Sequence, residues 1–136
     1  MRDVLFFMPH TKEEEFRKFI LPLYLLMQLS GKAYSKYMNN KIYLHALIIR
    51  SANGKIYDLI IKSLDIAPEE LHDHLLNLLN HYDIWFEQFN EHERKMKPSL
   101  SDSFIFYRLD DQSVFPKQAE QKILDYYHQS KKEIKN

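Results

Sequence analysis

PEELHDHLLNLLNHYDIWFEQFNEHE, which occupies residues 68–93, predicts one long amphipathic helix. Pro68 suits a first helical turn, where its missing N–H costs no hydrogen bond, and Glu69 and Glu70 place carboxylates at the positive end of the helix dipole. Apolar side chains then recur every three or four residues and form a continuous arc: Leu71, Leu75, Leu78, Tyr82, Trp85, Phe86 and Phe89. A helix with such an arc must pack against other elements, so this segment predicts a helical core.

A second helix is predicted over residues 12–29. Thr11 and Glu14 have the spacing of a capping box, which marks the start of a helix. Pro22 removes one backbone hydrogen bond and is expected to bend this helix. The pair Ser30-Gly31 is expected to break or turn it.

Residues 41–64 leave two structures open. Asn53-Gly54 between two apolar arms is a typical hairpin signal, so an α+β fold with a β-hairpin at 42–62 is the alternative. Helical spacing opposes it, because one line of residues falls at alternating steps of three and four: Ile42, His45, Ile49, Ala52, Ile56, Leu59 and Ser63. We therefore expect a helix that tolerates Gly54 at a cost of about 1 kcal/mol.

The remaining segments complete the prediction of the fold. A final helix is expected near 116–134, and residues 97–115 are expected to form an extended connector packed over one side of the other elements. No repeat or low-complexity block divides the chain, so residues 1–136 are expected to form a single helical domain. The predicted fold class is all-α, a bundle of about four helices near 12–29, 41–64, 68–94 and 116–134.

The composition excludes several classes of function. The 136 residues include no cysteine and only two glycines, so disulfides, thiolate metal sites and glycine-rich phosphate loops are excluded. The 19 Lys and Arg residues balance 19 Asp and Glu residues, which argues against a general nucleic-acid binder. The most apolar segment, 19–29, is too short to span a bilayer and follows directly on charged residues. We therefore expect no membrane insertion, no export and a cytoplasmic location.

The charges are segregated along the chain. Residues 65–93 carry eight acidic and no basic side chains, whereas residues 41–64 carry four basic and one acidic. A structural interpretation is that the acidic side chains are solvated or pair with Lys and Arg of neighbouring helices. The functional interpretation is that the helix at 68–94 docks a basic protein partner or a second copy of the chain.

Histidines gather on the same helix and supply candidate binding residues. His74, His81 and His92 fall on one flank, beside Trp85 and the apolar arc. His74 and His81 are about 10.5 Å apart along the helix axis, too far to share one ion. His45 lies on the predicted buried line of residues 41–64 and needs a hydrogen-bond partner there. We assign no catalytic residue, no metal ligand and no cofactor.

Two functions remain open on these observations. The first is a non-catalytic interaction or regulatory module that presents the acidic helix at 68–94 to a protein partner or to itself. The second is a small-molecule-binding protein or enzyme with an aromatic pocket around Trp85, Tyr82, His81 and His45. The first predicts a filled interior and an exposed apolar patch, and the second predicts a concave site with converging polar groups.

Overall fold

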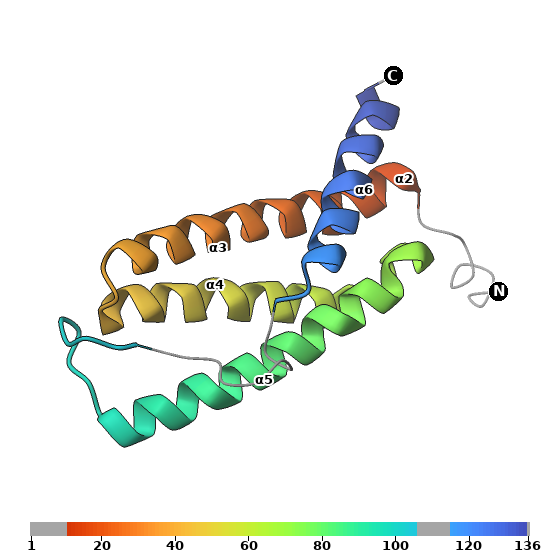
Figure 1. Ribbon diagram of the computed structural model, residues 1–136. Helices are drawn as coiled ribbons and strands as arrows, with labels where there is room; N and C mark the ends of the chain where they lie inside the picture. The colour runs from red at the N-terminus through yellow and green to blue at the C-terminus, as the bar shows by residue number, and fades with distance from the viewer. Residues whose placement is uncertain (1–10, 106–114, 136) are drawn as a thin grey trace.

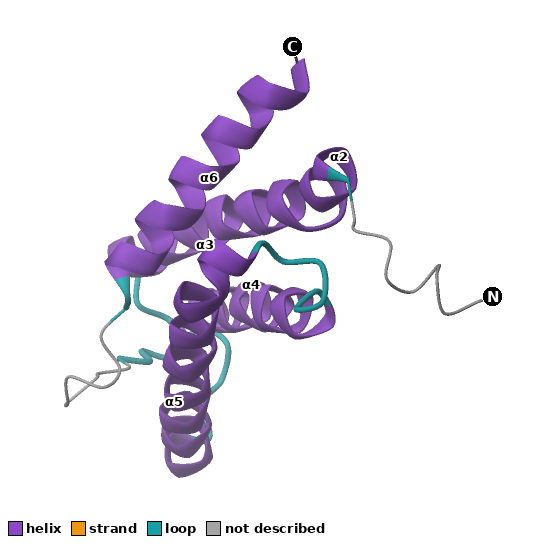
Figure 2. Cartoon of the chain, turned by 90° about the vertical axis from the view of Figure 1, so that its right-hand side faces the viewer, coloured by secondary structure: helices purple, strands orange, loops and turns teal. Residues whose placement is uncertain are grey.

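The computed structural model describes residues 11–105 and 115–135, and the regular elements within these ranges are all helical. Figures 1 and 2 show them packed as an all-α bundle, which confirms the predicted fold class. The elements are α2 (Lys12–Glu15), the π-helical turn η1 (Phe16–Ile20), α3 (Leu21–Asn39), α4 (Tyr43–Lys62), the 3-10 turn η2 (Glu69–Leu71), α5 (His72–Met96) and α6 (Lys117–Lys135). The alternative hairpin at 42–62 is wrong, since α4 runs through that segment as one helix.

The first helical run begins where the sequence predicts it. The Glu14 amide donates to the Thr11 hydroxyl at 3.0 Å, and the Thr11 amide donates to the Glu14 carboxylate at 3.3 Å. Both hydrogen bonds of the capping box therefore form. The Leu21 amide then donates to the Phe16 carbonyl, five residues back, so the irregularity expected at Pro22 takes the form of a π turn just before it.

The predicted break at Ser30-Gly31 is wrong, because α3 continues without interruption to Asn39. α3 lies antiparallel to α4 over its length (Figure 1), and the Ser30 hydroxyl donates to the Asn53 side chain of α4 at 2.8 Å. Packing along a neighbouring helix outweighs the cost of one helical glycine, which is about 1 kcal/mol relative to alanine.

α4 buries the face that helical spacing predicts. Ile49, Ala52 and Ile56 of the predicted line are all buried. Gly54 is accommodated inside the helix, and its neighbour Asn53 is buried as well. The hairpin signal therefore fails because both residues of the Asn-Gly pair lie in the middle of a helix that packs along α3.

The segment that follows α5 closes the start of α4. The Tyr43 amide donates to the Asp102 carbonyl, and the Leu44 amide donates to the Leu100 carbonyl, both at 2.9 Å. These are the first amides of α4, and Ile42 at its N-cap offers no side-chain hydrogen bond. Backbone carbonyls from a distant part of the chain therefore satisfy amides that a helix start leaves without an intrahelical partner.

Phe104 anchors this segment in the core. Its side chain is 0% exposed, its ring lies 5.1 Å from that of Phe89, and its carbonyl accepts a hydrogen bond from the Tyr37 hydroxyl at 2.6 Å. The packed connector is therefore confirmed over residues 97–105. The rest of it, residues 106–114, lies outside the described residues.

The core is made of two clusters of buried side chains. The α6-end cluster is covered by α6 and includes Phe19, Ile20, Leu23, Met27, Ile56, Leu75, Leu78, Tyr82 and Ile123. The connector-end cluster is closed by Phe104 and consists of Ala33, Tyr37, Ala46, Ile49, Trp85, Phe89 and Phe104. α6 contacts both α3 and α5 at the first cluster, whereas the connector does the covering at the second.

Among the described helices, none combines the length and the apolar composition that crossing a bilayer requires.

Candidate functional site

A cavity of about 490 Å³ lies where the two core clusters meet. Met27 and Tyr82 of the α6-end cluster and Ile49 and Trp85 of the connector-end cluster line it. Its volume falls within the range typical of small-molecule sites, about 300–1,000 Å³.

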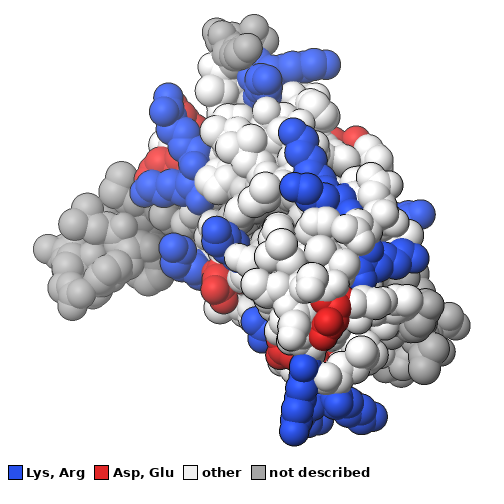
Figure 3. Space-filling view, turned by 90° about the vertical axis from the view of Figure 1, so that its left-hand side faces the viewer, with Lys and Arg blue, Asp and Glu red and all other residues white. Residues whose placement is uncertain are grey.

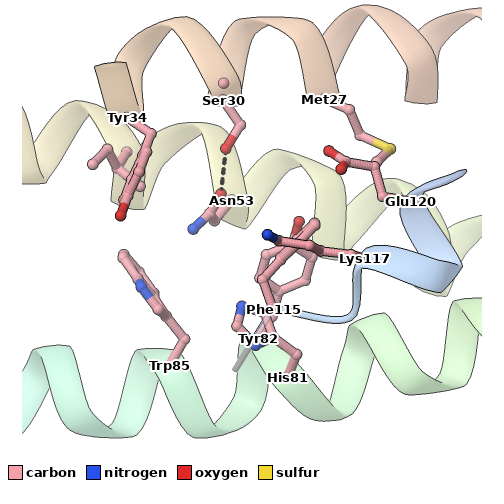
Figure 4. Close-up of a pocket in the computed structure, with 12 residues that line it drawn as sticks. Met27, Ser30, Tyr34, Asn53, His81, Tyr82, Trp85, Phe115, Lys117 and Glu120 are labelled. Atoms are coloured by element: carbon pink, nitrogen blue, oxygen red, sulfur yellow. Dashed lines mark hydrogen bonds between the residues drawn. The ribbon is translucent and has the colours of Figure 1, made fainter. Parts of the chain in front are cut away.

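Side chains from α3, α4, α5 and the start of α6 surround this cavity (Figure 4). α3 and α4 contribute Met27, Ser30, Gly31, Tyr34, Ile49 and Asn53. α5 and the residues at the start of α6 contribute His81, Tyr82, Trp85, Phe115, Lys117 and Glu120. Tyr34, which is 49% exposed, and the exposed Lys117 connect the cavity to solvent.

The cavity has an aromatic end and a charged end. Figure 4 shows Tyr34 of α3 and Trp85 of α5 pointing toward each other on one side, with the Tyr34 hydroxyl nearest to the Trp85 ring. Lys117 and Glu120 enter from the first turn of α6 on the other side, and Asn53 of α4 lies between the two ends. This arrangement provides a flat apolar surface at one end and polar groups at the other.

Asn53 supplies a buried polar group to the cavity from the middle of α4, with 5% of its surface exposed. Its Oδ1 accepts a hydrogen bond from the Ser30 hydroxyl at 2.8 Å, which orients the amide. Nδ2 then points into the cavity (Figure 4), and the part of the chain that the structure describes holds no acceptor for it. Nδ2 is not sealed from solvent, so it remains a donor that a molecule in the cavity can reach.

Tyr82 supplies a second buried polar group, with 3% of its surface exposed. Burial, with a further contribution from the nearby Glu120 carboxylate, raises the pKa of its phenol far above the ordinary value. The hydroxyl therefore stays protonated and remains available as a donor. Within the described residues, no side chain or backbone group forms a hydrogen bond with it.

Lys117 and Glu120 are three residues apart and both reach the cavity. The ion pairs found within residues 11–105 and 115–135 join residues four apart on the same helical run, and neither Lys117 nor Glu120 takes part in one. Their charges are thus available to a molecule in the cavity.

Histidine and aromatic rings form the floor of the cavity on α5. His81 is buried, and its ring packs edge-on against Tyr82 and Phe115 with centroid distances of 5.2 and 5.3 Å. The Trp85 ring lies 5.2 Å from that of Phe89, which ties the floor to the connector-end cluster. Packed rings of this kind hold their neighbours in fixed positions.

The structure brings together three of the six residues proposed from the sequence. His81, Tyr82 and Trp85 line the cavity. His45 is at the start of α4, where its Nδ1 lies 2.8 Å from the Asn40 carbonyl, and it is not a lining residue. The other two lie elsewhere on α5. His92 packs against Phe104 at 4.7 Å, and the half-buried His74 is two turns before His81.

The acidic side of α5 is mostly turned to solvent. Asp73 and Glu87 are exposed, while Tyr43 donates a hydrogen bond to Glu93 from α4 and thereby has its pKa raised. Among the described residues, no ion pair joins α5 to α3 or α4. The carboxylates of its outer face are therefore solvated rather than neutralised by the neighbouring helices.

No group of three or more His, Asp or Glu residues within the described ranges is arranged to hold a metal ion. Comparison of the chain with family models, curated proteins and solved structures finds no match.

Sequence reasoning missed the polar half of the cavity. Asn53 had a signal, because it interrupts an apolar line at helical spacing, with Ile49 four residues before it and Ile56 three residues after it. Lys117 and Glu120 had none, since charged residues in the first turn of a helix are usually solvated. Only the position of α6 against α3 and α5 turns them toward the cavity.

Proposed function

We propose that this chain is a small-molecule-binding protein whose ligand occupies the cavity between the two core clusters. The observation that carries the proposal is that Asn53 and Tyr82, two largely buried residues, line a cavity of ligand size with donors that no acceptor of the described chain uses and that a molecule in the cavity can reach. A molecule that offers acceptors can therefore pair with both donors without displacing a hydrogen bond of the described chain.

The ligand favoured by the walls contains a planar ring. Tyr34, Trp85 and Phe115 expose aromatic surface to the cavity, and aromatic pairs in stacked or edge-on contact contribute about 0.5–1.5 kcal/mol beyond the burial of their area. A ring that enters between Tyr34 and Trp85 gains such contacts on more than one side.

Trp85 is the only tryptophan of the chain and therefore reports binding directly through its fluorescence. Four probes with the same phenyl ring and two-carbon frame are titrated: L-phenylalanine, 3-phenylpropanoate, 2-phenylethylamine and 2-phenylethanol. We expect a saturable change in Trp85 emission with at least one of them, together with a rise of the melting temperature at saturating probe.

A matched pair of glycine variants assigns this binding to the cavity. Gly31 lines the cavity, and a Cβ built on it meets no heavy atom within 4 Å, so Gly31→Leu projects into the open space. Gly54 has equally open surroundings but lies outside the lining, so Gly54→Leu is the control. Binding should be lost in the first variant and kept in the second. The proposal is wrong if no probe binds, or if both variants bind as the wild type does.

A second candidate function is docking through the outer face of α5, and it is favoured by exposed carboxylates there that form no ion pair within the described residues, although Asp83 accepts a hydrogen bond from Tyr57. Asp73, Asp83 and Glu87 share this face with Leu76, which is 54% exposed. Residues 16–57 contain no acidic side chain at all. One molecule thus carries an acidic surface and a basic surface that do not neutralise each other within the described chain.

The basic counterpart is spread over α3 and α4. Lys32, Lys36, Lys55 and Lys62 are exposed there, and the view of the end where α3 turns into α4 shows basic side chains over the surface with few acidic ones (Figure 3). A second copy of the chain therefore offers charge complementarity to the α5 face, and opposite charges steer such an encounter.

Light scattering on a size-exclusion column tests the docking candidate. We expect self-association at low ionic strength that weakens as salt is added. Asp73→Lys combined with Glu87→Lys should abolish it, and so should Lys32→Glu combined with Lys55→Glu, while a mixture of the two variants should associate again. A wild type that stays monomeric at low salt, or a mixture that fails to associate, contradicts the docking candidate without affecting the cavity.

A further inference from the structure

We infer that the ligand of the cavity is a zwitterion of the aromatic amino-acid type, with its ring at the Tyr34–Trp85 end and its two charges at the α6 end. This inference rests on the proposed binding function and names the chemical class of the ligand. It follows from three features of the charged end: the free amide donor of Asn53, the position of Lys117 at the start of α6, and the Glu120 carboxylate inside the cavity.

The carboxylate position is defined by Asn53 and Lys117. The Oδ1 atom of Asn53 is already occupied by the Ser30 hydroxyl, so only the donor Nδ2 is left for a ligand. In Figure 4 the Lys117 ammonium extends from α6 toward this same amide. Two donors that converge from two helices, one of them charged, match the oxygens of a carboxylate.

The place of Lys117 in its helix supports a ligand-binding role. It is the first residue of α6, and a cation is disfavoured at that end because the helix dipole is positive there. Helix stability therefore gives no reason for a lysine at this position. A bound carboxylate removes the conflict, because it is attracted both to the ammonium and to the helix start.

The ammonium position is defined by Glu120. Its carboxylate enters the cavity one turn after Lys117 and lies close enough to Tyr82 to raise the pKa of the phenol. An anionic ligand without a positive group would bring its charge close to this carboxylate. A ligand that also carries an ammonium group instead pairs with it, so that each charged group of the cavity meets its opposite.

The distribution of apolar surface sets the rest of the ligand. Beyond the charged end lie the lining side chains of Trp85 and Tyr34, which offer aromatic rings. In an aromatic amino acid the ammonium and the carboxylate are both bonded to the α carbon, and the ring is attached through the next carbon. This order of groups matches the order found along the cavity.

The four phenyl probes test this inference by their ranking. L-Phenylalanine carries both charges, 3-phenylpropanoate only the carboxylate, 2-phenylethylamine only the ammonium, and 2-phenylethanol neither. We expect L-phenylalanine to bind the wild type at least about tenfold more tightly than either singly charged probe, which is the effect of one charge-assisted hydrogen bond.

Two variants assign the charges to their residues. Lys117→Met should weaken L-phenylalanine about tenfold and leave 2-phenylethylamine unchanged. Glu120→Gln should weaken L-phenylalanine and leave 3-phenylpropanoate unchanged or improved. Lys122→Met and Glu133→Gln, exposed on the same helix and away from the cavity, serve as controls and should bind as the wild type does.

The outcomes separate the two proposals. If a singly charged or neutral probe binds as well as L-phenylalanine, and Gly31→Leu still blocks it, the zwitterion is overturned and the binding function stands. If L-phenylalanine binds best but is insensitive to Lys117→Met and to Glu120→Gln, the assignment of the charged end is overturned. If none of the four probes binds, both proposals fail.

Discussion

The two ends of the core are closed by elements of very different size. At the α6 end a helix of 19 residues, Lys117–Lys135, covers the space between α3 and α5. At the other end a short segment does so with one fully buried ring, that of Phe104. The cavity lies at the boundary between the two clusters. Phe115 and Lys117, at the start of the segment that covers the α6-end cluster, line one part of it, and Ile49 and Trp85 of the connector-end cluster line another. Covering a core from two sides leaves space at the boundary, and polar groups collect there.

The largest expected effect on stability distinguishes Phe104, which closes the connector-end cluster, from Phe115, which lines the cavity. Phe104→Ala should destabilise the fold by about 3–4 kcal/mol, because the side chain is fully buried and its loss leaves a void. Phe115→Ala removes a half-buried ring at the cavity and should cost about 1 kcal/mol. Urea denaturation followed by circular dichroism measures both. Equal losses would mean that Phe115 closes the core as firmly as Phe104 does.

The next largest effect is expected from removing the hydrogen bond between Ser30 of α3 and Asn53 of α4, at the boundary between the two clusters. Asn53→Ala should cost about 1–2 kcal/mol, because it leaves the half-buried Ser30 hydroxyl without its acceptor. Removing both partners should cost less than the sum of the single changes, and a double-mutant cycle measures the difference. Additive losses would show that this pair contributes nothing to the joining of α3 and α4.

A smaller effect compares the two glycines. Gly31→Ala and Gly54→Ala should each stabilise the fold by about 0.5–1 kcal/mol, because both residues are helical and an added Cβ meets no atom within 4 Å. Thermal unfolding of the two variants measures the gain. A gain at Gly54 combined with a loss at Gly31 would indicate that the wall of the cavity is less open than the structure shows.

The smallest effect is on alkaline stability. In the folded chain burial, and then the Glu120 carboxylate, raise the pKa of Tyr82 above the ordinary value of 10.0. The unfolded chain loses this proton near pH 10 while the folded chain keeps it, so the contribution is complete below about pH 10 and is lost as the pH rises further. Tyr82→Phe should therefore lose less stability than the wild type between about pH 8 and about pH 11. Melting temperatures at the two pH values test this, with a Phe substitution at the half-buried residue Tyr24 as the control.

Local sequence signals predicted the helices well and the cavity poorly. The Thr11–Glu14 capping box and the apolar arc of α5 depend on residues within a few positions of one another, so the sequence contains all the information they need. The expected break at Ser30-Gly31 failed because the competing interaction, with Asn53, comes from 23 residues away.

The aromatic part of the site was predicted for a similar reason. His81, Tyr82 and Trp85 follow from the period of a single helix, which places them on one face. Asn53 and Lys117 come from two other helices, and their convergence depends on how those helices cross. No pattern within either segment contains that information. His45 was misplaced because its ring turns back to the Asn40 carbonyl instead of entering the core.

The carbonyls of Asp102 and Leu100 at the start of α4 also bear on the order of folding. Asp102 follows Tyr43 by 59 residues, so the first turn of α4 cannot be completed by local structure alone. The α3–α4 pair can form early, since its contacts are close in sequence. The N-terminal turn of α4, however, frays until α5 has folded and residues 97–105 have packed against it. The amide protons of Tyr43 and Leu44 therefore become protected from exchange only when residues 97–105 pack against α4. In the folded chain, the rate at which they exchange with solvent reports how often this segment detaches.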